Sequence, residues 1–89
     1  MDLEFVLNDD LYIADFTASG DFNLHIEQQS AGFVDVYQSS IADGKYDIVK
    51  GVAHTYREVF DEDFVGVVYP KYIRVVLQRA PSKAVVTFA

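Results

Sequence analysis

Apolar and polar residues alternate along much of the chain, and no segment shows a convincing helical period. The clearest alternation runs from Asp21 to Gln28, where Phe22, Leu24 and Ile26 would face one way and their polar neighbours the other. Such a segment is typical of a strand with one buried face and one wet face. Turn-forming residues separate similar segments at short intervals. The pattern therefore predicts an all-β protein.

The alternating segments together predict eight or nine strands. They cover residues 3–7, 11–17, 21–28, 34–39, 46–49, 54–60, 65–69, 72–77 and 84–88. A turn at residues 29–32 is expected to join two of these strands as an antiparallel pair, and residues 61–63 are expected to form an acidic loop. The fold that fits is a single small antiparallel β-sandwich or jelly roll of about eight strands, spanning residues 1–89 as one domain.

The stretch from Val65 to Leu77 is expected to lie at the centre of this fold. It holds the densest run of β-branched and aromatic residues, interrupted by Pro70. In its second segment Ile73 and Val75 belong to the face that we expect to be buried. The remaining strands are expected to cover this stretch.

Length and composition describe a small folded module. A chain of 89 residues has room for one domain, and its 51% hydrophobic content excludes a disordered chain. It has no cysteine, which excludes disulfides and thiolate metal sites. A small domain without such links depends on packing or on subunit contacts, so a homo-oligomer is expected.

Charge and hydropathy exclude two classes of partner. Fourteen acidic residues against seven basic ones give a net charge of -7, which would repel a nucleic-acid backbone. The N-terminal residues include acids where a signal peptide would have basic residues. The longest apolar run, residues 64–69, is far shorter than the roughly 20 residues of a membrane helix. We therefore expect no nucleic acid, no membrane, no export signal and no transmembrane segment.

No residue spacing typical of a catalytic or metal site is present. His25 and His54 lack the spacing of a zinc motif, and Asp61, Glu62 and Asp63 lack the alternation and the glycine of a calcium-binding loop. We expect no enzyme activity, no cofactor and no bound metal. A catalytic site assembled between subunits is the alternative that a single sequence would not reveal.

One polar stripe has the chemistry of a carbohydrate site. On the predicted sheet Asn23, His25 and Glu27 would lie beside Tyr37, and that tyrosine would in turn be flanked by Asp35 and Ser39. A tyrosine ring can cover a sugar face while amide, imidazole and carboxylate groups bind the hydroxyls. The same residues would also make an ordinary solvent-facing sheet, so both interpretations remain open.

A second outward set has the residue types that protein interfaces favour. Tyr72 and Arg74 lie on the polar side of their strand, with Tyr69 just before Pro70. Together they predict a contact with a subunit or another protein. The alternative is an exposed cross-strand ladder pair.

Two regions carry a resemblance to a known class of proteins. Over residues 17–40 the sequence has a Ser-Gly turn, an alternating apolar strand, a second turn and a strand that ends in a polar run. The matching residues there are Ser19, Gly20, Phe22, Leu24, Ile26, Val34, Val36, Gln38 and Ser39. Near the end of the chain they are Tyr72, Ile73, Arg74, Val75, Val85, Val86, Thr87 and Phe88. This order resembles small β-sandwich modules of tailed bacteriophages and prophages, found in tail, head-decoration and fibre proteins.

The resemblance implies a function without catalysis. It implies a structural or interaction module, associated with a virion, that assembles with itself, as a trimer in our expectation, or docks on a larger virion protein. The expected location is then the virion or the bacterial cytoplasm. At Asp43 and Gly44 the chain only partly matches the Asp-Gly-x-x-Trp turn of such modules. A carbohydrate-binding module remains the alternative.

Overall fold

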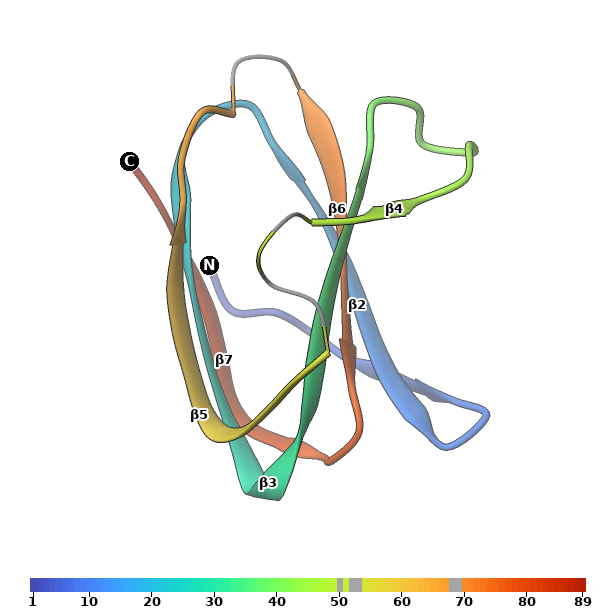
Figure 1. Cartoon of the computed structure of the whole chain (residues 1–89), viewed down its shortest axis with the longest axis vertical. Helices are drawn as coiled ribbons and strands as arrows, with labels where there is room; N and C mark the ends of the chain where they lie inside the picture. Colours follow the sequence, from blue (N-terminus) through green and yellow to red (C-terminus); the bar gives the residue numbers. More distant parts are fainter. Residues whose placement is uncertain (50, 52–53, 68–69) are drawn as a thin grey trace.

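The structure, a computed structural model, describes residues 1–49, 51, 54–67 and 70–89. These residues form one antiparallel sheet of seven strands, with no helix among them (Figure 1). The strands are β1 (Val6–Asn8), β2 (Leu11–Ala18), β3 (Phe22–Ser39), β4 (Asp47–Ile48), β5 (Thr55–Phe64), β6 (Lys71–Leu77) and β7 (Pro81–Phe88). The all-β prediction is confirmed, although the described residues form seven strands rather than eight or nine. The described part of the chain holds no helix suited to crossing a membrane.

The 18-residue strand β3 is the centre of the sheet. It pairs with β4, β5, β6 and β7, whereas β6 pairs with β2 and β3. The expectation that residues 65–77 form the organising element was therefore wrong. Among the described residues of this stretch only β6 is a strand; residues 65–67 are not, and residues 68–69 of the predicted strand lie outside the described part of the chain. Because β3 is so long, its two halves have different neighbours.

The two halves of β3 do not form the hairpin that the sequence predicted. The first half lies between β5 and β7, and the second half pairs with β6, β4 and the start of β5. The strand bends sharply in between, so that its halves face each other across the molecule (Figure 1). The sheet continues from β6 to β2 and β1 and does not close on itself.

A buried glutamine holds the bend of β3. Gln28 is 3% exposed, and its Nε2 donates to the carbonyl oxygens of Gly32 at 3.1 Å and Arg57 at 2.9 Å. Its Oε1 accepts a hydrogen bond from the backbone N–H of Arg79 at 3.0 Å. These bonds satisfy backbone groups that the bend removes from the regular ladder. The bend is thus a fixed corner.

The hydrophobic core lies between the two halves of the sheet. The alternation in β3 and β6 correctly predicted which side chains face it, and in β2 the inward face proves to be that of Phe16. The buried members of the core are Phe16, Ala18, Phe22, Leu24, Ile26, Val34, Val36, Phe60, Phe64, Ile73, Val75, Leu77, Ala84 and Val86. Since both halves of β3 contribute to one core, their outward side chains point to opposite sides of the molecule.

Three other boundaries differ from the prediction. Residues 61–63 belong to β5 rather than to a loop, and β7 begins at Pro81. The first strand is Val6–Asn8, because the residues before it bind β7 instead. There the backbone N–H of Leu3 donates to the carbonyl oxygen of Ala84 at 2.9 Å. The N-terminal segment thus covers the outer edge of β7 before the chain reaches β2.

Candidate functional site

A polar network covers the outer face of the first half of β3. Asn23 donates from Nδ2 to Asp61 at 2.7 Å and to Asp63 at 2.9 Å, across the β3–β5 ladder. His25 lies between two carboxylates, with Nδ1 3.1 Å from Asp61 and Nε2 2.7 Å from Glu27. Three of the predicted ligand-binding residues therefore come together. Both ring nitrogens of His25 are already engaged with protein groups.

The network shifts the pKa values of its members. The hydrogen bond to Glu27, and next that to Asp61, raises the pKa of His25 above its ordinary value of 6.5. The bond to His25 lowers the pKa of Glu27. The pKa of Asp61 is lowered by Asn23 first and by His25 second. The network therefore favours an imidazolium held between carboxylates.

The acids of this face are explained by cross-strand pairing. Asp61 and Asp63 stand directly opposite His25 and Asn23, where opposite charges and amide groups stabilise a sheet. This pairing is why Asp61 and Asp63 can occupy a strand although their composition favours a loop. Among the described residues no group of three or more His, Cys, Asp or Glu side chains is arranged to hold a metal ion.

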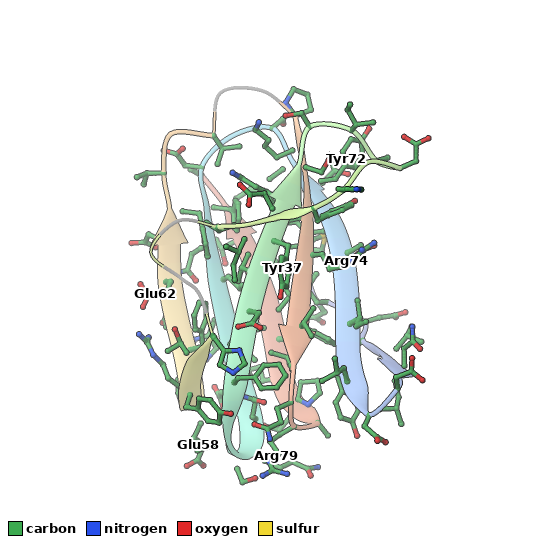
Figure 2. All side chains as sticks on the ribbon, turned by 45° about the vertical axis from the view of Figure 1, so that its right-hand side comes forward. Tyr37, Glu58, Glu62, Tyr72, Arg74 and Arg79 are labelled. Atoms are coloured by element: carbon green, nitrogen blue, oxygen red, sulfur yellow. The ribbon has the colours of Figure 1, made fainter. Side chains whose placement is uncertain are left out.

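Tyr37 does not join the other three predicted ligand-binding residues. It lies on the outward face of the second half of β3, paired with Arg74 of β6 (Figure 2). Its hydroxyl donates a long hydrogen bond of 3.4 Å to Asp35. Burial, and then the charge of Asp35, raises the pKa of Tyr37. The predicted four-residue stripe was based on a hairpin that does not exist, so it is two separate surfaces.

A cluster that the sequence did not suggest surrounds Asp35. This carboxylate is 6% exposed; its Oδ2 lies 3.1 Å from Nδ1 of His54, and its Oδ1 has no hydrogen-bond partner among the described residues. The His54 ring stacks on Phe33 with centroids 4.7 Å apart, and Tyr56 packs edge-on against both rings. His54 has a left-handed backbone, with φ of 49°. No sequence signal links these residues, because a long connection separates the histidine from the aspartate.

Of the predicted interface residues Tyr69, Tyr72 and Arg74, the structure shows Arg74 already bonded within the chain. Arg74 donates to both carboxylate oxygens of Asp15, at 2.9 and 3.0 Å, and its guanidinium lies 4.2 Å from the ring centroid of Tyr46. Asp15 raises the pKa of Arg74 further. These bonds make Arg74 a cross-strand ladder residue. Tyr72 is partly exposed on the same face, and Tyr69 lies outside the described residues.

The outer edge of β5 carries charges that disfavour pairing with another chain. Glu58, Asp61 and Asp63 are exposed along it. Glu62 occupies an inward-facing position opposite Leu24 and is held by Arg57 at 2.8 Å. Inward-pointing charges on an edge strand are a common defence against edge-to-edge association. The longest open edge is therefore protected.

The outer edge of β1 has no such protection. This strand lies at the end of the strand order, and Val6 and Leu7 are 69% and 59% exposed. A tight turn at Asp9 and Asp10, both with positive φ, joins it to β2 as a projecting hairpin (Figure 1). Exposed apolar side chains on an open edge are a typical site for association with another strand.

The comparisons with known proteins give no information on the function of this chain. No protein-family model matches the chain, and no match was found among curated proteins or solved structures.

Proposed function

We propose that this protein is a non-enzymatic interaction module, a small β-sandwich that associates with further copies of itself through the outer edge of β1. The observation that carries the proposal is the exposure of Val6 and Leu7 on an edge strand whose outer side pairs with no described residue. Backbone groups on that edge would pair with those of a second β1, and the two side chains would cover apolar surface on both faces.

The contrast between the edges supports this choice. The edge of β5 is charged, and the edge of β7 is covered by the N-terminal segment, where the backbone N–H of Val86 donates to the carbonyl oxygen of Met1 at 2.8 Å. Two β1 strands related by a two-fold axis would form a dimer, whereas the trimer expected from the sequence would require β1 to bind a different surface. A virion of a tailed phage is the setting that the sequence resemblance supports.

Light scattering coupled to size exclusion tests the proposal. The wild type is expected to have the mass of two or more protomers, and Val6→Lys to have the mass of one. Val59→Lys is the matched control, because Val59 is similarly exposed, at 51%, but lies on the protected edge of β5. A monomeric wild type at high concentration would overturn the proposal, and dissociation by the control would move the interface away from β1.

Carbohydrate binding is the second candidate, supported by the aromatic surface beside Tyr37. Tyr56 is 62% exposed and packs against His54 and Phe33, next to the buried carboxylate of Asp35. Aromatic faces beside a carboxylate suit a sugar ring. A glycan array with the wild type, Tyr37→Ala and Tyr56→Ala would test it. Glycan binding by the wild type that is lost in the two variants would support carbohydrate binding. A wild type that binds no glycan would exclude it.

A further inference from the structure

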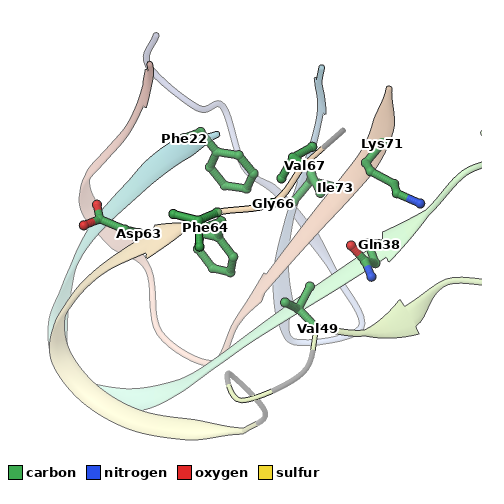
Figure 3. A pocket seen from close by; sticks show the side chains of 10 residues that line it. Phe22, Gln38, Val49, Asp63, Phe64, Gly66, Val67, Lys71 and Ile73 are labelled. Carbon is green, nitrogen blue, oxygen red and sulfur yellow. The ribbon is translucent and has the colours of Figure 1, made fainter. Parts of the chain in front are cut away.

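A hollow of about 390 Å³ opens at the end of the molecule where β3 and β6 begin and β5 ends (Figure 3). Its size is within the range of about 300 to 1,000 Å³ that small-molecule sites occupy. The described residues that line it are Phe22, Gln38, Val49, Asp63, Phe64, Val65, Gly66, Val67, Lys71 and Ile73. The hollow thus lies between the two halves of the sheet, away from the edge of β1.

The inner wall of the hollow is apolar and well ordered by packing. Phe22 and Phe64 stack with ring centroids 4.8 Å apart, and both are at least nine-tenths buried. Ile73 is 2% exposed, and Val49 and Val67 pack on the same core. A ligand entering here would meet rigid aromatic and branched aliphatic surface. The wall suits a short hydrocarbon or aromatic body.

Among the described residues that line the hollow, Lys71 is the basic one. Lys71 Nζ donates to Ser40 Oγ at 2.7 Å, which uses one of the three N–H donors of an ammonium group. The carboxylate on the rim, Asp63, instead accepts a hydrogen bond from Asn23 at 2.9 Å on the outer face, and Figure 3 shows it directed away from the hollow. Gln38 adds a neutral amide. The rim therefore favours an anionic group close to Lys71.

We propose that this hollow binds a small amphiphile with a single anionic head group, with the head on Lys71 and the apolar body against Phe22, Phe64 and Ile73. The ammonium would form a charge-assisted hydrogen bond with a carboxylate, and the apolar body would be removed from water. The site is independent of the self-association through β1, because none of its lining residues belongs to that hairpin.

Calorimetric titration with three probes of equal chain length tests the proposal. Sodium octanoate is expected to bind, 1-octanol to bind about tenfold more weakly, and octylammonium to bind more weakly still. A hydrogen bond to a charged group contributes about 1.5 to 3 kcal/mol, and 1.4 kcal/mol corresponds to a tenfold change in the dissociation constant. Lys71→Met is expected to weaken octanoate about tenfold while leaving octanol unchanged. Lys83→Met, an exposed lysine outside the hollow, is the control and is expected to change neither.

A second variant tests the apolar wall. Val67→Trp would fill the hollow and is expected to abolish binding of octanoate and octanol, with circular dichroism confirming that the variant is folded. Amide chemical shifts of Gly66 and Val67 are expected to move when octanoate is added to the wild type. No octanoate binding at millimolar concentration, equal binding of octanoate and octanol, or an unchanged affinity in Lys71→Met would each overturn the proposal. Because oligomer mass is a separate measurement, failure here leaves the proposed function unaffected.

Discussion

Gln28 and Gly32 are joined across the corner of β3 by a hydrogen bond of 3.1 Å from the glutamine amide to the glycine carbonyl. The glycine is required there, because a Cβ at position 32 would lie 2.7 Å from the side chain of Arg79 and 3.1 Å from Oε1 of Gln28 itself. The side chains of Arg79 and Gln28 together therefore occupy the space that a larger residue at position 32 would need.

Replacing Gln28 by leucine should destabilise the protein strongly. Three backbone groups lose their partner, one from a buried hydrogen bond and two from part-buried ones. A buried group left unpaired costs about 1 to 3 kcal/mol, so a loss of about 3 kcal/mol is expected for the three together. Urea denaturation measures it. The neighbouring Gln29→Leu, at an exposed position, is the control and should change the free energy of unfolding by less than about 0.5 kcal/mol. Equal effects of the two variants would mean that the corner does not depend on Gln28.

The core itself is tested by two truncations. Phe22→Ala removes a ring that stacks on Phe64 and is 3% exposed, and should cost about 3 to 5 kcal/mol. Val75→Ala removes a smaller, fully buried side chain, and should cost about 1 to 3 kcal/mol. Glu27→Ala, on the outer face, should cost little. Denaturant midpoints that fall in any other order would contradict the assigned faces of the sheet.

The His25 network should make stability depend on pH. Because the folded pKa of His25 is raised, its contribution is complete below 6.5, its ordinary pKa, and is lost as the pH rises through the folded pKa. The lowered pKa values of Glu27 and Asp61 act oppositely: their contribution is present above their ordinary values of 4.5 and 3.8 and is lost as the pH falls. The network should therefore stabilise most between pH 4.5 and 6.5.

Thermal denaturation from pH 5 to pH 9 measures this dependence. The wild type should lose stability on the alkaline side, and His25→Gln should lose less over the same range. Since the side chain of His25 is 30% exposed, solvent screens the effect and it should be modest. An unchanged alkaline slope in the variant would show that other groups cause it.

The buried carboxylate of Asp35 should be more dispensable than its partner. Asp35→Val removes Oδ1, which has no described partner, and Oδ2, whose partners His54 and Tyr37 are partly exposed and can bond to water instead. The free energy of unfolding should therefore change by less than about 1 kcal/mol or increase. His54→Asn keeps a residue that tolerates the left-handed backbone but removes the bond to Asp35, and should cost about 1 to 3 kcal/mol. A larger loss in Asp35→Val than in His54→Asn would contradict this.

The sequence predicted those parts of the fold that depend on local alternation. The inward faces around Phe22 and Ile73 follow from the alternation of side chains between the two faces of a strand. This alternation does not depend on which strands pair with it. The corner of β3 was mistaken for a hairpin turn, because residues 29–32 have turn composition. Only the partners of Gln28, contributed by distant segments, decide between a turn and a corner.

The candidate sites were harder to predict for the same reason. The group of Asn23, His25 and Glu27 on one face was correct, since these residues alternate on one strand. Tyr37 was placed beside them through the hairpin that was wrong. The Asp35 cluster and the hollow beside Lys71 each combine segments far apart in the chain, and no local pattern records such combinations. The edge of β1 is open because its only described partner is the neighbouring strand β2, and a local pattern does not show which strand ends the sheet.

Because β7 pairs with the first half of β3, the sheet can be completed only after the last strand has been synthesised. While residues 81–88 are still to be synthesised, one side of residues 22–28 lacks its hydrogen-bonding neighbour. Pairings between such distant segments pay loop-closure entropy before they gain contacts, and domains dominated by them fold in about milliseconds to seconds. Until then, of the described strands, the first half of β3 has only β5 beside it. During that interval a nascent chain is most open to pairing with the wrong strand of a neighbour.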